Sequence, residues 1–155
     1  MSVPTSSNVI CRTWTGQVAV WQGLACHQTP DDLLNFAACV WSCAPRDVVE
    51  VGSGDGGTTA FLRSVAFQVH AVDVGSAPVR VSDAFVILDG DVYSHASMRA
   101  DLATYAPMAQ WLVVCHTNRS DWGAASAVAE WRLSHPDWDE MAVPHPTQHT
   151  WLVRR

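Results

Sequence analysis

The stretch that decides the fold is Val48–Asp73, which reads VVEVGSGDGGTTAFLRSVAFQVHAVD. It begins with a short apolar run, Val48–Val51, of the kind that forms a buried parallel strand. A glycine-rich turn and a segment that predicts a helix follow, and a second apolar run, Phe67–Val72, ends at Asp73. A strand, a glycine turn, a helix and a second strand that ends in a carboxylate form the layout of a nucleotide-binding βαβ unit.

Two classes of cofactor fit this unit. Gly52, Gly54 and Gly57 satisfy the spacing G-x-G-x-x-G of dinucleotide-binding proteins. Asp73 follows about 20 residues later, where such proteins carry the acid that binds a ribose. Glu50 precedes the first glycine, however, and a carboxylate there would repel a pyrophosphate but would suit the ammonium group of S-adenosylmethionine. The sequence therefore favours S-adenosylmethionine over NAD, and a βαβ turn that binds no ligand is the third alternative.

The composition predicts one globular domain. The chain has 155 residues, of which 48% are hydrophobic, and this length is sufficient for a hydrophobic core. We expect residues 1–155 to form a single domain, with residues 1–28 as an N-terminal extension. The net charge is −6 and no lysine is present. Because phosphate contacts require clustered positive charge, we expect no nucleic-acid partner.

Sequence features also predict the compartment. Met1–Asn8 is polar and lacks the basic start and the apolar stretch of a signal peptide. No apolar run approaches the length of a membrane span, so no membrane partner is expected. The five cysteines are an odd number; Cys39 and Cys43 have the i, i+4 spacing of half a metal site, but no second pair completes it, so packing is the favoured role. We therefore expect a cytoplasmic protein with reduced thiols.

Apolar patterns and turn residues predict the remaining elements. In chain order they are a hairpin from Ile10–Thr15 and Val18–Trp21, a helix that begins after Thr29 and ends before Pro45, a strand at Phe85–Leu88, a helix at His95–Tyr105, a strand at Trp111–Cys115, a helix capped by Asp121, and two antiparallel strands at Met141–Val143 and Thr150–Val153.

The link between the second and third parallel strands is short. Gly75–Ala84 has ten residues, too few for a helix, a strand and a second helix, and Val79–Val81 is at most a short remnant strand. One face of the sheet would then lack covering helices, and a bare apolar face is not tolerated in water. We expect the Val9–Trp21 segment or a second subunit to cover it, and we predict a homodimer.

Five stretches carry a resemblance to a known family, and they occur in the family's order. They are residues 50–59, EVGSGDGGTT; 86–91, VILDGD; 99–107, RADLATYAP; 111–117, WLVVCHT; and 128–138, VAEWRLSHPDW. In these stretches the chain resembles the class I S-adenosylmethionine-dependent methyltransferases. The likeness is greatest to the small O-methyltransferase branch that includes cephalosporin-hydroxylase-like proteins.

The resemblance implies an α/β, Rossmann-like methyltransferase fold. The sheet would be mostly parallel, with helices on both faces and an antiparallel C-terminal hairpin, and it would be abbreviated between the family's second and fourth strands. The resemblance also implies that S-adenosyl-L-methionine is the cofactor. By position, the resemblance implies that the methionine part of the cofactor lies at Glu50, Gly52, Ser53 and Gly54. It implies that Asp73, after the second strand, binds the ribose, and that Asp89, after the fourth, lies near the transferred methyl group.

Transfer of a methyl group to oxygen requires an aligned hydroxyl and a group that takes its proton. His116 and His95 follow strand ends at the expected active edge, and with Asp89 they are the catalytic candidates. The resemblance also implies a metal site, because the family often holds a divalent metal between an acid after the fourth strand and an acid after the fifth. In this chain these positions are Asp89 and His116, so Mg²⁺ bound by these two residues is a further hypothesis. His145 and His149 flank a turn and are predicted to be surface residues.

Three functions follow from these observations. The first is an S-adenosylmethionine-dependent methyltransferase that O-methylates a small hydroxylated molecule. The second is a degenerate member of the fold that binds the cofactor or a protein partner without catalysis. The third is an NAD-linked oxidoreductase, against which Glu50 and the lack of a substrate domain argue.

Overall fold

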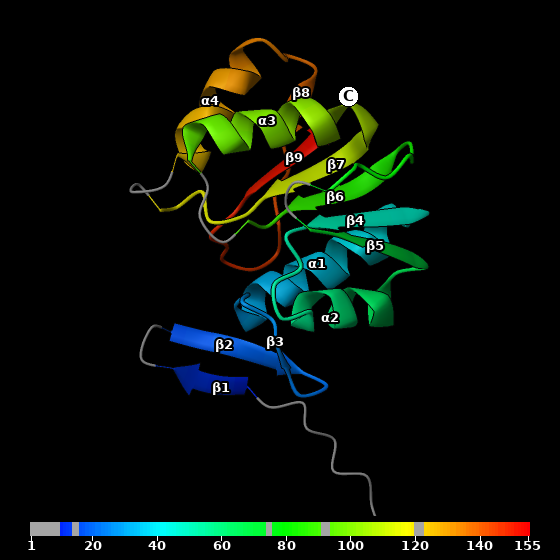
Figure 1. Ribbon diagram of the computed structural model, residues 1–155, viewed down its shortest axis with the longest axis vertical. Helices are drawn as coiled ribbons and strands as arrows, with labels where there is room; N and C mark the ends of the chain where they lie inside the picture. Colours follow the sequence, from blue (N-terminus) through cyan, green and yellow to red (C-terminus); the bar gives the residue numbers. More distant parts are fainter. Residues whose placement is uncertain (1–9, 14–15, 74–75, 91–93, 120–122) are drawn as a thin grey trace, which may run out of the picture.

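The structure is a computed structural model that describes residues 10–13, 16–73, 76–90, 94–119 and 123–155 (Figure 1). Among these residues, no helix is both long enough and apolar enough to cross a membrane.

A six-stranded sheet forms the centre of the molecule, in the order β5-β4-β6-β7-β9-β8. β4, β5, β6 and β7 run parallel, whereas β9 is antiparallel to both β7 and β8. The prediction of a mostly parallel α/β sheet with an antiparallel C-terminal pair is confirmed. The strands are β4 (Asp47–Val51), β5 (Gln68–Val72), β6 (Ala84–Leu88), β7 (Ala109–Val114), β8 (Trp138–Glu140) and β9 (Thr150–Arg154).

Two helices cover each face of this sheet (Figure 1). α1 (Pro30–Cys43) and α2 (Gly57–Val65) pack on one face. α3 (His95–Tyr105) and α4 (Ala124–Leu133) pack on the other, and a short 3-10 turn, Ala106–Met108, joins α3 to β7.

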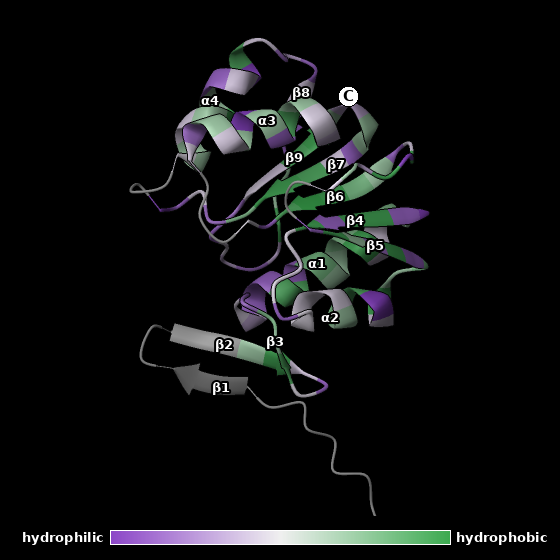
Figure 2. Ribbon diagram, in the orientation of Figure 1, coloured by the Kyte–Doolittle hydropathy of each residue, from purple (hydrophilic) through white to green (hydrophobic). Residues whose placement is uncertain are grey.

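The strands β4 and β6 are buried along their whole length. This burial fits the unbroken apolar run of β6, whereas β4 buries the two acids Asp47 and Glu50 as well. In Figure 2 the ribbon of β6 is accordingly green, whereas that of β4 is partly purple. Val49 and Val51 face α3 and α4, whereas Val48 belongs to the cluster of α1 and α2. Because side chains alternate along a strand, Glu50 also faces α2.

The N-terminal hairpin is confirmed and lies outside the α1–α2 layer (Figure 1). β1 (Ile10–Thr13), β2 (Gly16–Trp21) and β3 (Leu24–Ala25) form a separate antiparallel sheet. The ring of Trp21 contacts Phe61 of α2 edge-on, with 5.2 Å between the ring centroids. The hairpin therefore packs on a helix and not on the central sheet.

The prediction of a bare sheet face was wrong. Residues 76–83 contain no helix and no strand, so Val79–Val81 is not a strand either. Val79 and Val81 instead pack, partly buried, against the cluster below α3 and α4. Coverage of the sheet therefore requires neither the Val9–Trp21 segment nor a second subunit.

The start of α4 and the penultimate strand also differ from the sequence prediction. The helix begins after Gly123, and Asp121, its predicted cap, lies outside the described residues. The penultimate strand is Trp138–Glu140 and not Met141–Val143. Asp139 and Glu140 are poor strand formers, and their pairing with β9 overrides this preference.

Candidate functional site

The glycine turn brings the carboxyl end of β4 against the carboxyl end of β6. Gly52 has a φ of 91°, and a Cβ built on it would lie 2.3 Å from the backbone oxygen of Asp89. Only glycine allows both this backbone conformation and this approach. The predicted residues of the turn and Asp89 are therefore neighbours.

Glu50 is fully buried beneath this turn. The hydroxyl of Thr59 on α2 donates a hydrogen bond to its Oε2 atom, whereas Oε1 has no hydrogen-bond partner. Burial raises the pKa of Glu50 from 4.5 to about 7, and the bond from Thr59 opposes this shift only in part. A carboxyl group with an unsatisfied oxygen next to a glycine turn suits a cationic ligand group.

Asp73 and Ser53 form the outer rim of the same turn. Ser53 Oγ donates a hydrogen bond of 3.3 Å to Asp73 Oδ1, and the Asp73 side chain is exposed. The backbone N–H of Gly52 donates to the oxygen of Val72, which holds the ends of β4 and β5 together. An exposed carboxylate at this position can accept hydrogen bonds from two adjacent hydroxyl groups of a ligand.

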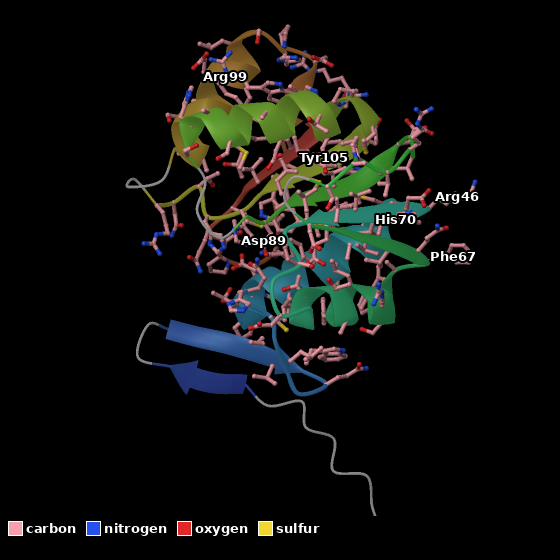
Figure 3. The ribbon with its side chains drawn as sticks, in the orientation of Figure 1. Arg46, Phe67, His70, Asp89, Arg99 and Tyr105 are labelled. Atoms are coloured by element: carbon pink, nitrogen blue, oxygen red, sulfur yellow. The ribbon has the colours of Figure 1, made fainter. Side chains whose placement is uncertain are left out.

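Asp89 and His116 meet at the ends of β6 and β7. His116 Nε2 lies 3.2 Å from Asp89 Oδ1, and their side chains are 18% and 8% exposed. In Figure 3 Asp89 lies at the end of the sheet opposite Arg46 and Phe67, which precede β4 and β5. The pair is therefore at the carboxyl edge, where open α/β sheets bind ligands.

His149 belongs to this site, so the prediction that it is a surface residue was wrong. It is 7% exposed, and its Nε2 atom lies 2.8 Å from Oε1 of the buried Gln28. The amide nitrogen of Gln28 donates a 2.6 Å hydrogen bond to Asp89 Oδ2. The Nδ1 atom of His149 accepts a 3.1 Å hydrogen bond from the backbone N–H of His116.

Asp32 extends this set of polar residues to the start of α1. Its backbone N–H donates to Oγ1 of Thr29, which caps α1, and its carboxylate accepts from the hydroxyls of Thr29 and Thr147. Asp32 Oδ1 also lies 3.5 Å from His149 Nε2, and both side chains are fully buried. We call Gln28, Asp32, Asp89, His116 and His149 the polar cluster.

Burial dominates the ionisation of two residues in and beside the polar cluster. It lowers the pKa of His149, against the opposing effect of the Asp32 carboxylate. It also raises the pKa of Cys115, which keeps this buried thiol protonated. His149 is therefore neutral at pH 7, with a proton on Nε2 and an accepting lone pair on Nδ1.

His95 is not joined to this site by any contact among the described residues. Its Nε2 atom lies 2.9 Å from Glu130 on α4, which also pairs with Arg99. The structure thus brings Asp89 and His116 together and gives His95 a partner on the neighbouring helix.

The segment before α1 lies directly on the glycine turn. A Cβ on Gly57 would lie 2.2 Å from the backbone oxygen of Ala25, and the hydroxyl of Thr58 donates to the backbone oxygen of Cys26. His27 pairs with the exposed Asp55 at 2.8 Å. Sequence reasoning missed these contacts and Gln28 because nothing local distinguishes residues 24–28 from an ordinary loop.

The residues of the turn fit an amino-acid-bearing nucleoside better than a metal. Glu50 has a buried oxygen without a hydrogen-bond partner, position 52 has no space for a side chain, and the carboxylate of Asp73 is exposed at the rim of the turn. Within the described ranges, no three His, Cys, Asp or Glu side chains are placed to hold a metal ion together.

Comparisons with known proteins agree with this geometry. Residues 13–81, somewhat under half of the chain, match the family described as Rhamnosyl O-methyltransferase/CmcI. The structure is similar to a crystal structure of the O-methyltransferase from Bacillus cereus in complex with SAH, with a TM-score of 0.54 and 9% sequence identity over 82% of each chain. No curated protein matched in sequence. The first part of the chain is thus similar to this O-methyltransferase family, and the fold as a whole is the Rossmann-like fold of the Bacillus cereus structure.

Proposed function

We propose that the protein transfers a methyl group from S-adenosylmethionine to a hydroxyl group of a small molecule. The main observation in support is that the Glu50–Asp73 turn and the Asp89–His116 pair meet at one edge of the sheet, where Gly52 contacts Asp89. The family match and the fold support the same activity.

The two halves of this site would have different tasks. The cofactor, when bound, supplies a methyl group activated on a sulfonium. Asp73 would bind its ribose, the turn at Gly52 and Gly54 would bring the protein backbone close to the cofactor, and Glu50 would attract its ammonium group. His116 would take the proton that the acceptor hydroxyl loses, and Asp89 would stabilise the imidazolium that forms.

One observation favours the alternative of a degenerate member that binds without catalysis. Residues 76–83, which would have to wall the adenine, contain neither helix nor strand. The NAD-linked alternative is disfavoured by Glu50, because a buried carboxyl group beside the turn would repel a pyrophosphate.

Calorimetry with S-adenosylhomocysteine and with NAD separates these functions. We expect micromolar binding of S-adenosylhomocysteine and none of NAD. The Asp73→Ala variant should weaken binding about 10-fold to 100-fold, because it removes hydrogen bonds to a charged acceptor. Asp139→Ala, on β8 and paired with Arg155, is the matched control and should leave binding unchanged.

Methyl transfer to hydroxylated acceptors then divides the first two functions. Binding without transfer to any acceptor would favour the degenerate member, and tighter binding of NAD would contradict the proposal. The Mg²⁺ hypothesis is tested in the same assay, since Asp89 and His116 offer two ligands and loss of activity in EDTA would support it.

We further propose a cytoplasmic location and a homodimer. Four cysteines with described side chains, Cys26, Cys39, Cys43 and Cys115, are free thiols, which supports a reducing compartment. Leu34 and Trp41 lie seven positions apart on α1 and are 51% and 68% exposed, which supports an interface on that helix. A monomer in light scattering at micromolar concentration would contradict the dimer.

A further inference from the structure

The proposed reaction assigns no role to three residues of the polar cluster, and two of them, Gln28 and His149, contact the proposed catalytic pair directly. Both are more than nine-tenths buried, and they come from opposite ends of the described chain. Each contacts one member of the proposed catalytic pair: Gln28 contacts the carboxylate of Asp89, and His149 contacts the backbone of His116.

The hydrogen bonds of Gln28 are possible in only one orientation of its amide. The nitrogen must face Asp89 Oδ2 at 2.6 Å, because a carboxylate accepts and cannot donate. The oxygen then faces His149 Nε2 at 2.8 Å and requires a proton on that nitrogen. Gln28 thereby occupies one oxygen of Asp89 and leaves the other, Oδ1, to His116.

His149 is fixed in turn by its neighbours. With a proton on Nε2, its Nδ1 atom is an acceptor, and the backbone N–H of His116 donates to it at 3.1 Å. A second proton on Nδ1 would oppose that N–H group. Phe36 stacks on the ring at a centroid distance of 6.0 Å and an interplanar angle of 12°. Neither the tautomer nor the plane of the imidazole is therefore free to change.

The backbone of His116 explains why such support is needed. Its φ is 57°, in the left-handed region that residues other than glycine seldom adopt. The bond from its N–H to His149 and the ring contact between the two histidines, 5.5 Å between centroids, hold this conformation. A relaxed backbone would move the imidazole away from Asp89.

We propose that Gln28 and His149 are positioning residues that hold Asp89 and His116 in the geometry required for proton removal from the acceptor. This inference rests on the proposed function. The link runs from Asp89 through Gln28 and His149 to the backbone of His116, so it closes a ring around the catalytic pair. Its members come from the segment before α1, from the ends of β6 and β7, and from the loop before β9.

The first test uses the unmodified protein and needs no activity. The imidazole nitrogen shifts of His149, measured by NMR with nitrogen-15 labelling at pH 7, should be those of a neutral ring protonated on Nε2. A ring protonated on Nδ1, or a charged ring, would overturn the proposal even if methyl transfer occurs. Should no acceptor be methylated, this measurement still decides the arrangement, while the proposed function alone fails.

The second test separates positioning from binding. Gln28→Leu and His149→Phe keep the approximate volume and, for the second variant, the ring stacked on Phe36. We expect kcat to fall about 100-fold, the effect of a misplacement near 1 Å, and binding of S-adenosylhomocysteine to stay within about threefold. Thermal unfolding confirms that each variant is folded.

Two matched variants complete the second test. Gln68→Leu on the exposed edge of β5 and His145→Phe on the loop before β9 make the same exchanges outside the cluster. Both should leave kcat unchanged. If either cluster variant is folded and retains kcat within about twofold, its residue has no positioning role and the proposal is overturned.

Discussion

The proposed site has two halves, one for the cofactor and one for catalysis, and they are built differently. The cofactor half is local: Glu50, Gly52, Ser53 and Asp73 lie within one βαβ unit, and the backbone of the turn sets their places. The catalytic half is assembled from four distant positions, 28, 89, 116 and 149, by buried hydrogen bonds. A site of the first kind depends on backbone conformation, and a site of the second kind depends on every polar partner being present.

The largest expected effect breaks the catalytic half alone. His116→Asn removes the imidazole but tolerates the left-handed backbone conformation at this position. We expect kcat to fall about 10²-fold to 10⁴-fold, as for the loss of a general base, with binding of S-adenosylhomocysteine unchanged. Steady-state kinetics and calorimetry check the two halves separately, with His135→Asn at the opposite edge as the control. Equal loss of binding and turnover would mean that the halves are not separable.

The next variant breaks the cofactor half through its backbone. Gly52→Ala places a Cβ 2.3 Å from the oxygen of Asp89 at a φ of 91°, and we expect it to destabilise the fold by about 3 kcal/mol or more. Gly56→Ala has a similar φ, 81°, but its Cβ meets nothing within 4 Å, so it should cost only about 1–2 kcal/mol. Urea unfolding measures both. Equal losses would show that the approach to Asp89 is unimportant.

A third prediction, whose effect disappears at low pH, sharpens the comparison through the ionisation of Glu50. The pKa of Glu50 is about 7 in the folded protein and 4.5 in the unfolded chain, so the folded state binds this proton more tightly. The contribution of Glu50 to stability is therefore present below about pH 4.5 and is lost as pH rises to about 7.

In the variant Glu50→Gln the side chain at this position stays neutral at every pH. We expect the variant to exceed the wild-type protein in unfolding free energy by up to about 3 kcal/mol above pH 7, and the difference should vanish near pH 4.5. Chemical unfolding across this range gives the measurement, and the exposed Glu130→Gln is the control. A wild-type protein that gains stability relative to Glu50→Gln as pH rises would contradict the assignment.

The same contrast explains how much of the protein was predictable from its sequence. The βαβ unit, the start of α1 at Thr29 and the ends of α3 were predicted because each depends on neighbours in the chain. The strand at Trp138–Glu140 was missed because it has three residues, two of them acidic, and only its pairing with β9 forms it. Met141–Val143 has the better strand composition, but the ladder with β9 ends at the bond from the Met141 N–H to the oxygen of Trp151.

For the site, the limit of prediction was distance along the chain. Glu50, Asp73, Asp89 and His116 follow or flank strand ends, and such positions can be found from an apolar run. His149 stands in a polar turn after Pro146, a pattern typical of the surface. Its burial depends on Asp32, Gln28 and Phe36, each more than 100 positions away. No local pattern carries that information.

Asp32 has a consequence for how this protein could change during evolution. Its carboxylate accepts hydrogen bonds both from Thr29, which caps α1, and from Thr147, in the loop that carries His149. A substitution that improves catalysis by reshaping this corner would also alter how readily the helix forms. Selection for a new acceptor would therefore act on folding yield as well. Variants with altered specificity should be sought first among residues that contact the site but not the start of a helix.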